Sequence, residues 1–258
     1  MKTVLHAVVA AFATFSKIPM PRIEWNEKSL RGLMGALPLV GVAIGLVCYL
    51  YFLLAGWLKL PAVLSAVVLT ILPLAVSGGI HMDGFADTID ALSSYGDPEK
   101  KRAILKDPHA GAFAILGVGC YLLLYFGLCT ALPLNSQILV LLGITHVLAR
   151  ANGALAGTVL KGSTEKGMLA AFRDASSRGN VWALIVWSVL SLAGAALLMP
   201  LAAALFAVLT AGVFYYVKRT AEKQFGGMSG DLAGFCISVT EIALLLGLVL
   251  SERLTALL

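Results

Sequence analysis

Charged side chains are scarce in this sequence: Asp, Glu, Lys and Arg make up 13% of its 258 residues, about half the share in a soluble globular protein. Hydrophobic residues make up 59%, and the mean hydropathy is +0.91. So few charges cannot cover a water-facing surface, which argues against a soluble enzyme. The shortage of polar residues also excludes a disordered chain. The composition predicts an all-α, polytopic membrane bundle that forms one domain over 1–258.

Cysteines are also few. The chain has four, and all of them lie in apolar stretches without a C-x-x-C pair: Cys48, Cys120, Cys129 and Cys236. This pattern excludes a disulfide framework and a cysteine metal site. We expect the four thiols to be small, buried hydrophobic groups.

Long apolar runs, in contrast, are abundant. A helix needs about 20 apolar residues to cross a bilayer, and seven runs meet or approach that length: 33–57, 60–80, 110–132, 134–149, 181–199, 200–217 and 232–251. The preceding segment, 1–32, is less clear, because Ala11-Phe12-Ala13 resembles a signal-peptide cleavage site. The positive charge that follows this site resists export. We therefore expect a retained amphipathic helix that lies at the cytoplasmic face or re-enters the membrane.

The basic residues predict the orientation of the chain. Seventeen of the 19 lie before the first run or between runs two and three, four and five, or six and seven, and the alternate connections hold only Lys59 and Arg253. The positive-inside rule then places the N-terminus in the cytoplasm and the C-terminus outside. We expect the membrane to be the cytoplasmic (inner) membrane. The charges are divided among four membrane-bound loops, which argues against a nucleic-acid partner. Twelve of the 14 acidic residues lie on the same side, so a site built from them would face the cytoplasm.

The strongest chemical signal is an acidic helix within the cytoplasmic segment 81–109. Asp83, Asp87 and Asp90 have the spacing i, i+4, i+7, which places them within about 60° of one another on a helix. Three carboxylates in one stripe repel each other unless a cation neutralises them. Oxygen ligands at this density suit Mg²⁺, which usually keeps coordination positions open for a substrate phosphate. We therefore predict that these three residues bind Mg²⁺ and act in phosphoryl transfer, rather than form a merely solvated face.

Three further residues near this helix allow more than one role. His81 could contact a phosphate or act as a base, or it could be a structural histidine at the membrane interface. Lys106 and Asp107 precede Pro108-His109-Ala110-Gly111, where Asp107 could either cap the next helix or contribute to catalysis, with Lys106 on a phosphate. In the same segment Asp97 precedes a proline, so we interpret it as a helix N-cap.

A glycine-rich loop precedes the last apolar run. Gly226, Gly227 and Gly230 leave backbone N–H groups free to approach an anion, and the following helix adds its dipole. Asp231 could belong to this phosphate-binding loop or could be a helix N-cap. Glu241 lies about 15 Å further along that helix, where an unpaired carboxylate is costly. We expect it to face the bundle interior and to meet a base or a hydroxyl group, and Arg150 and Asn152 are similar inward-facing candidates.

These motifs together resemble a known family. Gly79-Ile80-His81-Met82-Asp83-Gly84-Phe85-Ala86-Asp87-Thr88-Ile89-Asp90 is similar to the GGxHxDGxxDxxDG signature of cobalamin synthase, also called adenosylcobinamide-GDP ribazoletransferase. The segments 15–21, 106–111 and 226–231, followed by Glu241, resemble other elements of that family in the same order. Two positions depart from its pattern: Ala91 replaces a frequent Gly, and His109 replaces a common Arg.

The resemblance implies a Mg²⁺-dependent membrane transferase. Adenosylcobinamide-GDP would react with α-ribazole, or with its 5′-phosphate, to give adenosylcobalamin or its phosphate and to release GMP. Asp83, Asp87 and Asp90 would hold the metal, and Asp90 or Asp107 would accept the proton of the ribazole 5′-hydroxyl. His81, Lys106 and the 226–231 loop would bind substrate. A homo-oligomer, or a complex with other enzymes of cobalamin assembly, is a further expectation.

Two alternatives remain at this point. A CDP-alcohol phosphotransferase also sets a carboxylate helix at a membrane face, although this chain lacks the Ala-Arg pair of that signature. An ion-coupled transporter would account for an intramembrane Glu241. However, the chain shows no internal repeat, and its carboxylates cluster at one membrane face.

Overall fold

The computed structural model describes residues 2–23, 25, 30–164 and 167–257. Within these residues the regular elements are all helical, in the following order: α1 (Lys2–Phe15), α3 (Leu33–Trp57), α4 (Ala62–Ser77), α5 (Ile80–Ser93), α6 (Pro98–Ile104), α7 (Ala112–Ala131), α8 (Ser136–Val159), α9 (Met168–Ala175), α10 (Arg178–Leu198), α11 (Pro200–Thr220), the π-helical turn η1 (Ala221–Phe225) and α12 (Gly230–Thr255). Glu24, Glu27, Lys28, Glu165 and Lys166, whose charges entered the orientation argument, lie outside the described residues.

The predicted membrane bundle is confirmed. In the described ranges, six helices are long and apolar enough to cross a bilayer, and a seventh crossing results if α4 and α5 count as one bent span. The two helices meet at 96°, because Gly78 and Gly79 take φ values of 69° and 77° at the break. L side chains rarely adopt that left-handed conformation, which explains why two glycines stand there. The bend turns the acidic helix away from the direction of α4.

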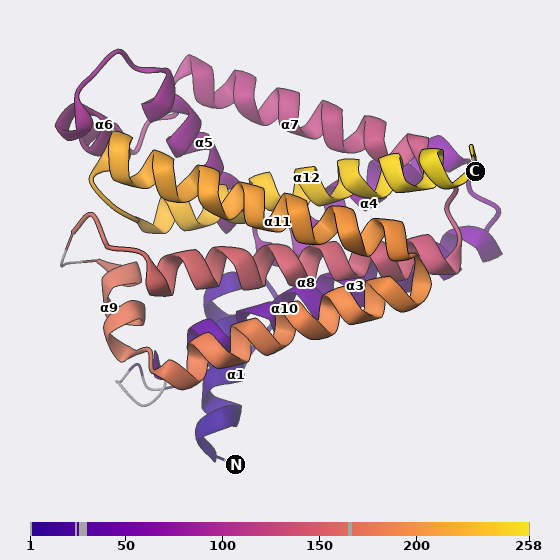
Figure 1. The fold of residues 1–258 in the computed structure, drawn as a ribbon, viewed down its shortest axis with the longest axis horizontal. Helices are drawn as coiled ribbons and strands as arrows, with labels where there is room; N and C mark the ends of the chain where they lie inside the picture. The colour runs from indigo at the N-terminus through magenta and orange to yellow at the C-terminus, as the bar shows by residue number, and fades with distance from the viewer. Residues whose placement is uncertain (1, 24, 26–29, 165–166, 258) are drawn as a thin grey trace.

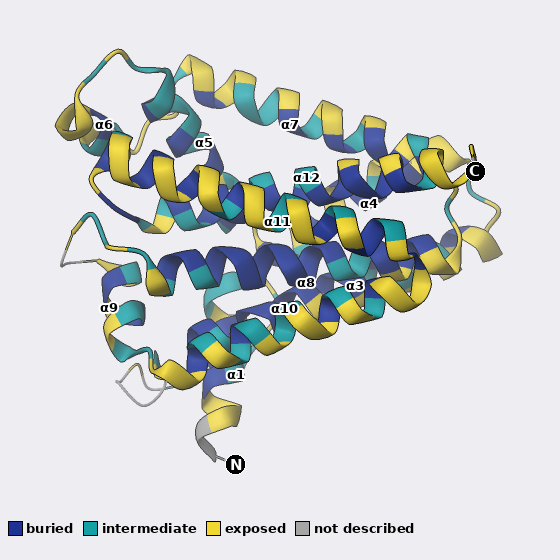
Figure 2. Cartoon of the chain, viewed as in Figure 1, coloured by how far each residue is buried: buried dark blue, intermediate teal, exposed yellow. Residues whose placement is uncertain are grey.

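The core of the bundle is α8, which Figure 2 shows mostly in the colour of buried residues. Of its most apolar stretch, 78% is buried, against 17% for α10 on the outside. Glycines allow α3 to pack closely on α8: a Cβ atom on Gly41 would lie 2.6 Å from the His146 carbonyl oxygen, and one on Gly45 would lie 2.7 Å from Gly143 Cα. Small residues at helix contacts are the usual means of close packing between membrane helices.

The fourth apolar run forms a longer helix than predicted. We expected it to end near residue 149, where the sequence becomes polar, but α8 continues to Val159. Arg150 and Asn152 do not end the helix, because partners on α11 and α12 accept hydrogen bonds from Arg150 Nη1 and Asn152 Nδ2 inside the bundle. Asn152 Nδ2, for example, donates to Thr240 Oγ1 at 3.0 Å and to the Thr210 carbonyl oxygen at 3.2 Å.

One cysteine differs from the expectation. Cys48, Cys129 and Cys236 are buried, but Cys120 is exposed. It lies on an outward face of α7, where Leu123 and Leu124 are also exposed. An apolar position in a membrane helix can face lipid as well as the core, and composition alone does not separate the two.

The short helices and the connections with site-like motifs gather at one end of the bundle. Figure 1 shows α5, α6 and α9 there, with the C-terminus at the opposite end. A backbone bridge between Gly162 and Met228 joins the α8–α9 connection to the loop before α12. We call this end, comprising residues 80–111, 160–164, 167–177 and 221–231, the motif end.

Candidate active site

The site is organised around a close crossing of α5 and α12. A Cβ atom on Gly84 would lie 2.7 Å from the main-chain oxygen of Asp231, and one on Gly234 would lie 3.0 Å from the His81 carbonyl oxygen. Side chains at these two glycines would therefore separate the helices. The crossing places the start of the acidic helix beside the first turn of α12. Asp83 and Asp231, far apart in sequence, consequently become neighbours.

The predicted acidic stripe is present and gains a fourth member. Asp83, Asp87 and Asp90 all lie on α5. Burial raises the pKa of the half-buried Asp87 carboxyl group, and the negative charges of Asp83, Asp231 and Asp90, in that order, raise it further. Asp90 extends toward the next helix, because its carboxylate packs against Gly111, the residue before α7. Repulsion of this kind is relieved when a cation is bound.

The carboxylates fit a hard divalent cation in chemistry. Their donors are all oxygen atoms, the type that Mg²⁺ prefers. In the part of the chain that the structure describes, however, no three His, Cys, Asp or Glu side chains are close enough together to hold a metal ion. The fit therefore rests on the donor type and on the concentration of negative charge. It does not rest on an assembled coordination shell.

An apolar cavity of about 270 Å³ lies beside Asp83 and Asp231. Its walls come from the ends of α1 and α3, from α5, α8, α9 and α12, and they include Phe15, His81 and Phe172. The His81 ring stacks on Phe15, with centroids 5.7 Å apart. We call this the aromatic cavity.

A second cavity of about 260 Å³ lies next to the first and has a basic wall. Arg102, Lys106 and Arg173 line it, and Ser163 and Ser229 add hydroxyl groups. We call it the basic cavity. Two adjacent contacts fix its α6 wall to η1: Arg102 Nη1 donates to the Phe225 carbonyl oxygen at 3.0 Å, and Lys101 Nζ donates to Gln224 Oε1 at 2.7 Å.

The two cavities share part of their walls. Gly230 and Asp231 line both of them, together with Met168 and Leu169 of α9. A ligand that occupied both cavities would therefore pass the Asp231 carboxylate. This arrangement can hold an anionic group on one side of a carboxylate centre and an apolar group on the other.

The predicted site residues are only partly brought together. Asp83, His81, Lys106, Gly230 and Asp231 line one or both cavities, whereas Asp87, Asp90 and Asp107 do not. Gly226 and Gly227 are held by their own loop, because their N–H groups donate to the Ala221 carbonyl oxygen.

The helix N-caps at the motif end agree with the prediction only in part. Asp97 is an N-cap, since its side chain accepts from Lys100 N. The alternative that Asp231 caps α12 is wrong, because Ser229 is the N-cap and accepts from Leu232 N. Asp107 does not cap α7 either, since Gly111 holds that position. Its Oδ1 atom instead accepts from His109 N at 2.9 Å within the exposed loop.

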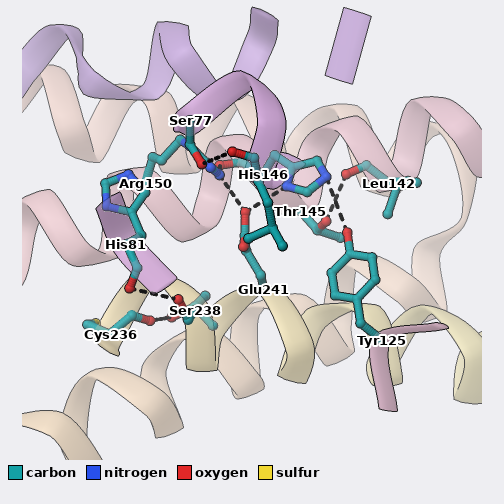
Figure 3. A network of polar contacts seen from close by, with 12 residues as sticks. Ser77, His81, Tyr125, Leu142, Thr145, His146, Arg150, Cys236, Ser238 and Glu241 are labelled. Atoms are coloured by element: carbon teal, nitrogen blue, oxygen red, sulfur yellow. Dashed lines mark hydrogen bonds and ion pairs between the residues drawn. The ribbon is translucent and has the colours of Figure 1, made fainter. Parts of the chain in front are cut away.

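Glu241 has the basic partner that we expected. Figure 3 shows it directed from α12 at two residues of α8: Arg150 Nη1 lies 2.6 Å and His146 Nδ1 lies 2.7 Å from its Oε1 atom. All three side chains are buried. Removing one member of such a group leaves an uncompensated buried charge at a cost of about 3–5 kcal/mol. The network therefore locks α12, and with it Asp231, against the core helix.

Sequence reasoning missed several residues of the site. Arg102 and Arg173 carry charge in predicted cytoplasmic segments, but their spacing gave no sign that they share a wall. Phe15 and Phe172 are separated by most of the chain, although their rings lie 6.1 Å apart. His146 lies in an apolar run, and the only signal for it was the need of Glu241 for a partner.

The comparisons with known proteins all indicate the same family. The family model for cobalamin-5-phosphate synthase matches residues 7–249. Relatives named adenosylcobinamide-GDP ribazoletransferase include one from Lachnoclostridium phytofermentans, 39% identical, and one from Geobacillus kaustophilus, 36% identical. The first alignment covers 96% of this chain and 95% of the relative, and the second covers 95% of both. No solved structure matches. These matches do not favour the CDP-alcohol or transporter alternatives.

Proposed function

The chain belongs to the cobalamin-5-phosphate synthase family, and from this premise we propose that the carboxylates at the crossing of α5 and α12 form its reaction centre. The chain transfers the adenosylcobinamide-phosphate part of adenosylcobinamide-GDP to ribazole and releases GMP, the final step of cobalamin assembly. One observation carries the proposal: the basic and the aromatic cavity meet at Asp231. A reaction between an anionic diphosphate and a nucleoside needs two such compartments.

The basic cavity is the proposed place of the diphosphate. Arg102, Lys106 and Arg173 offer cationic donors to phosphate oxygens, which form stronger hydrogen bonds with charged donors than with neutral ones. The exposed Gly230 at the start of α12 lies beside them, where a helix N-terminus also favours an anion. A diphosphate held there would present its reacting phosphorus toward Asp231.

The reaction exchanges one phosphorus–oxygen bond for another. The 5′-hydroxyl oxygen of ribazole forms a bond to the phosphorus that carries cobinamide, and the bond between that phosphorus and GMP breaks. The hydroxyl proton passes to a carboxylate. Asp90 and Asp107 were the predicted acceptors, but neither lines the aromatic or the basic cavity, whereas Asp231 lines both. We therefore assign the proton to Asp231.

Mg²⁺ is the proposed cofactor. Asp83 and Asp87, with Asp90 further along the stripe, are the residues that would hold it. When bound, the ion neutralises negative charge on the transferring phosphoryl group. The proposed setting is the inner membrane with the motif end in the cytoplasm. Self-association and complexes with other assembly enzymes stay predictions.

Removing a single stripe carboxylate tests this centre. We expect Asp83→Asn and Asp87→Asn to lower kcat for GMP release about 100-fold or more, because the charge that would bind the metal and offset the phosphoryl charge is lost. The measurement is Mg²⁺-dependent GMP release from adenosylcobinamide-GDP and α-ribazole by the purified full chain in detergent.

Asp97→Asn is the matched control. It changes an acidic residue of the same segment, and asparagine caps a helix as well as aspartate does, so activity should stay near that of the unchanged chain. Near-normal activity of Asp83→Asn and Asp87→Asn would refute the assigned centre. An unchanged chain that forms no GMP would refute the proposed reaction itself.

A further inference from the structure

His81 lines the aromatic cavity, and its side chain has an unused hydrogen-bonding atom. The residue is only 6% exposed, and its Nε2 atom is buried without a hydrogen-bond partner among the described residues. A buried polar atom of this kind costs about 1–3 kcal/mol unless it is paired. The backbone of His81 is fixed meanwhile, since its carbonyl oxygen accepts from Ser238 Oγ at 3.3 Å (Figure 3). The imidazole is thus held in place and lacks a partner on its Nε2 side.

Two aromatic rings pack beside the imidazole, one directly and one through the other. Phe15 stacks on the imidazole with an interplanar angle of 27°, and Phe172 meets Phe15 edge to face at 68°. All three rings line the cavity, although they come from α1, α5 and α9. Stacked and edge-to-face rings favour a further flat aromatic ring beside them. The wall therefore suits a planar heterocycle with a nitrogen or oxygen acceptor.

Size and polarity narrow the choice of ligand. About 270 Å³ lies just below the ~300–1,000 Å³ typical of sites for whole drug-sized ligands, so the cavity takes one ring system and not a corrinoid. Among the described residues, the polar side chains that line it are those of His81, Asp83 and Asp231, and the two carboxylates mark the reaction centre. A guanine base has several donors and acceptors, which would be costly to bury with so few partners. A benzimidazole base has apolar edges and a single free ring nitrogen.

We propose that the aromatic cavity binds the benzimidazole base of the ribazole nucleophile, with His81 Nε2–H donating to the free ring nitrogen. The inference rests on the proposed function, which supplies the substrate pair. In this position the base lies on one side of Asp231, and the ribose 5′-hydroxyl extends toward the basic cavity. His81 then acts on the base of the nucleophile, not on a phosphate.

Two variants distinguish binding of the ribazole base from a general effect on the enzyme. His81→Phe keeps a ring against Phe15 but removes the donor, and we expect the KM for α-ribazole to rise roughly tenfold. Phe172→Leu removes an aromatic wall outside the long apolar helices and should raise the same KM about three- to tenfold. For both variants the KM for adenosylcobinamide-GDP should stay unchanged. Phe206→Leu is the matched control, because Phe206 is fully buried in α11 and lines neither cavity.

Equilibrium dialysis of α-ribazole against the full chain in detergent gives a readout that does not depend on turnover. Weaker binding by His81→Phe and Phe172→Leu, but not by Phe206→Leu, is the expected result. A rise in the KM for adenosylcobinamide-GDP alone would place guanine in the cavity and overturn the proposal. Unchanged binding of α-ribazole by both variants would also overturn it. If the unchanged chain binds α-ribazole in this pattern but forms no GMP, the proposed function fails and this inference stands.

Discussion

Asp107 and Asp231 carry the same side chain in opposite surroundings. Asp107 is exposed, and the hydrogen bonds from the backbone N–H and the ring of His109 lower the pKa of its carboxyl group. A lowered pKa means that the group stays ionised throughout the neutral range and is a weak proton acceptor. Any stability that it adds is present above the ordinary pKa of aspartate and is lost as the pH falls through the lowered value. Asp231 lies half-buried between the two cavities.

The contrast predicts different effects of one substitution. We expect Asp231→Asn to lower kcat about 100-fold or more, because the proposed proton acceptor is lost. Asp107→Asn should keep kcat within about threefold and should leave the pH profile unchanged between pH 5 and 8, roughly, since the Asp107 carboxylate does not titrate there. The measurement is kcat for GMP release across that range. A large loss of kcat in Asp107→Asn with full activity in Asp231→Asn would show that the proton acceptor is Asp107, in the α6–α7 loop, and not Asp231.

Prediction at this scale succeeds where the signal is local. The stripe of Asp83, Asp87 and Asp90 follows from helical spacing alone, and the Asp97 cap follows from the proline after it. The partner of Glu241 could be predicted only as a type, because which residue of α8 faces it depends on the rotation of two helices. The same holds for Phe172, whose contact with Phe15 depends on how α9 folds back.

At the scale of elements, the site depends on how closely two helices approach. The Gly84 Cα lies against the Asp231 backbone, which leaves no space for a Cβ atom. The Arg150–Glu241 ion pair holds α12 on α8 from the other side. The position of Asp231 is therefore determined by α5 on one side and by α8 on the other.

Gly84→Ala tests this dependence. The added methyl group would meet the Asp231 main-chain oxygen at 2.7 Å, so the helices must shift apart. We expect a loss of about 1–3 kcal/mol in stability and a fall of at least tenfold or so in kcat, since misplacement by about 1 Å can cost 100-fold. The measurements are the melting temperature in detergent and the rate of GMP release.

Gly119→Ala is the matched control for this substitution. It makes the same change on α7, where an added Cβ atom meets nothing within 4 Å, so both quantities should stay near those of the unchanged chain. Full activity of Gly84→Ala would show that the crossing does not position the centre.

Element boundaries could be predicted wherever the hydrophobic run ends without help from neighbours. The run at 33–57 gives α3 with the same ends. The end of α8 could not be predicted, because a polar residue within a helix is tolerated when another helix supplies its partner. The bend between α4 and α5 had a visible cause in two glycines, but its angle depends on the contact with α12.

For the whole molecule, the arrangement of the two cavities brings segments from most of the chain to one end. The first cavity draws on α1, α3, α5, α8, α9 and α12, and the second on α6, α9 and the loops that the Gly162–Met228 bridge joins. Hydrophobic runs and the distribution of basic residues could predict that these segments share a membrane face. They could not predict two cavities with a common wall, because that requires the packing of seven separate helices and two loops.

The last prediction at this scale concerns the membrane face on which the motif end lies. Glu99 on α6 and Lys59 between α3 and α4 are exposed at opposite ends of the bundle. With Cys120 replaced by Ser, the remaining native thiols are buried, so Glu99→Cys and Lys59→Cys each present one accessible thiol. A membrane-impermeant maleimide should label Glu99→Cys only in inside-out vesicles and Lys59→Cys only in right-side-out vesicles, because positive loops stay in the cytoplasm. The reverse pattern would place the reaction centre outside, away from a cytoplasmic supply of its GDP-activated substrate. Labelling of both thiols in one type of vesicle would contradict a bundle whose two ends lie on opposite membrane faces.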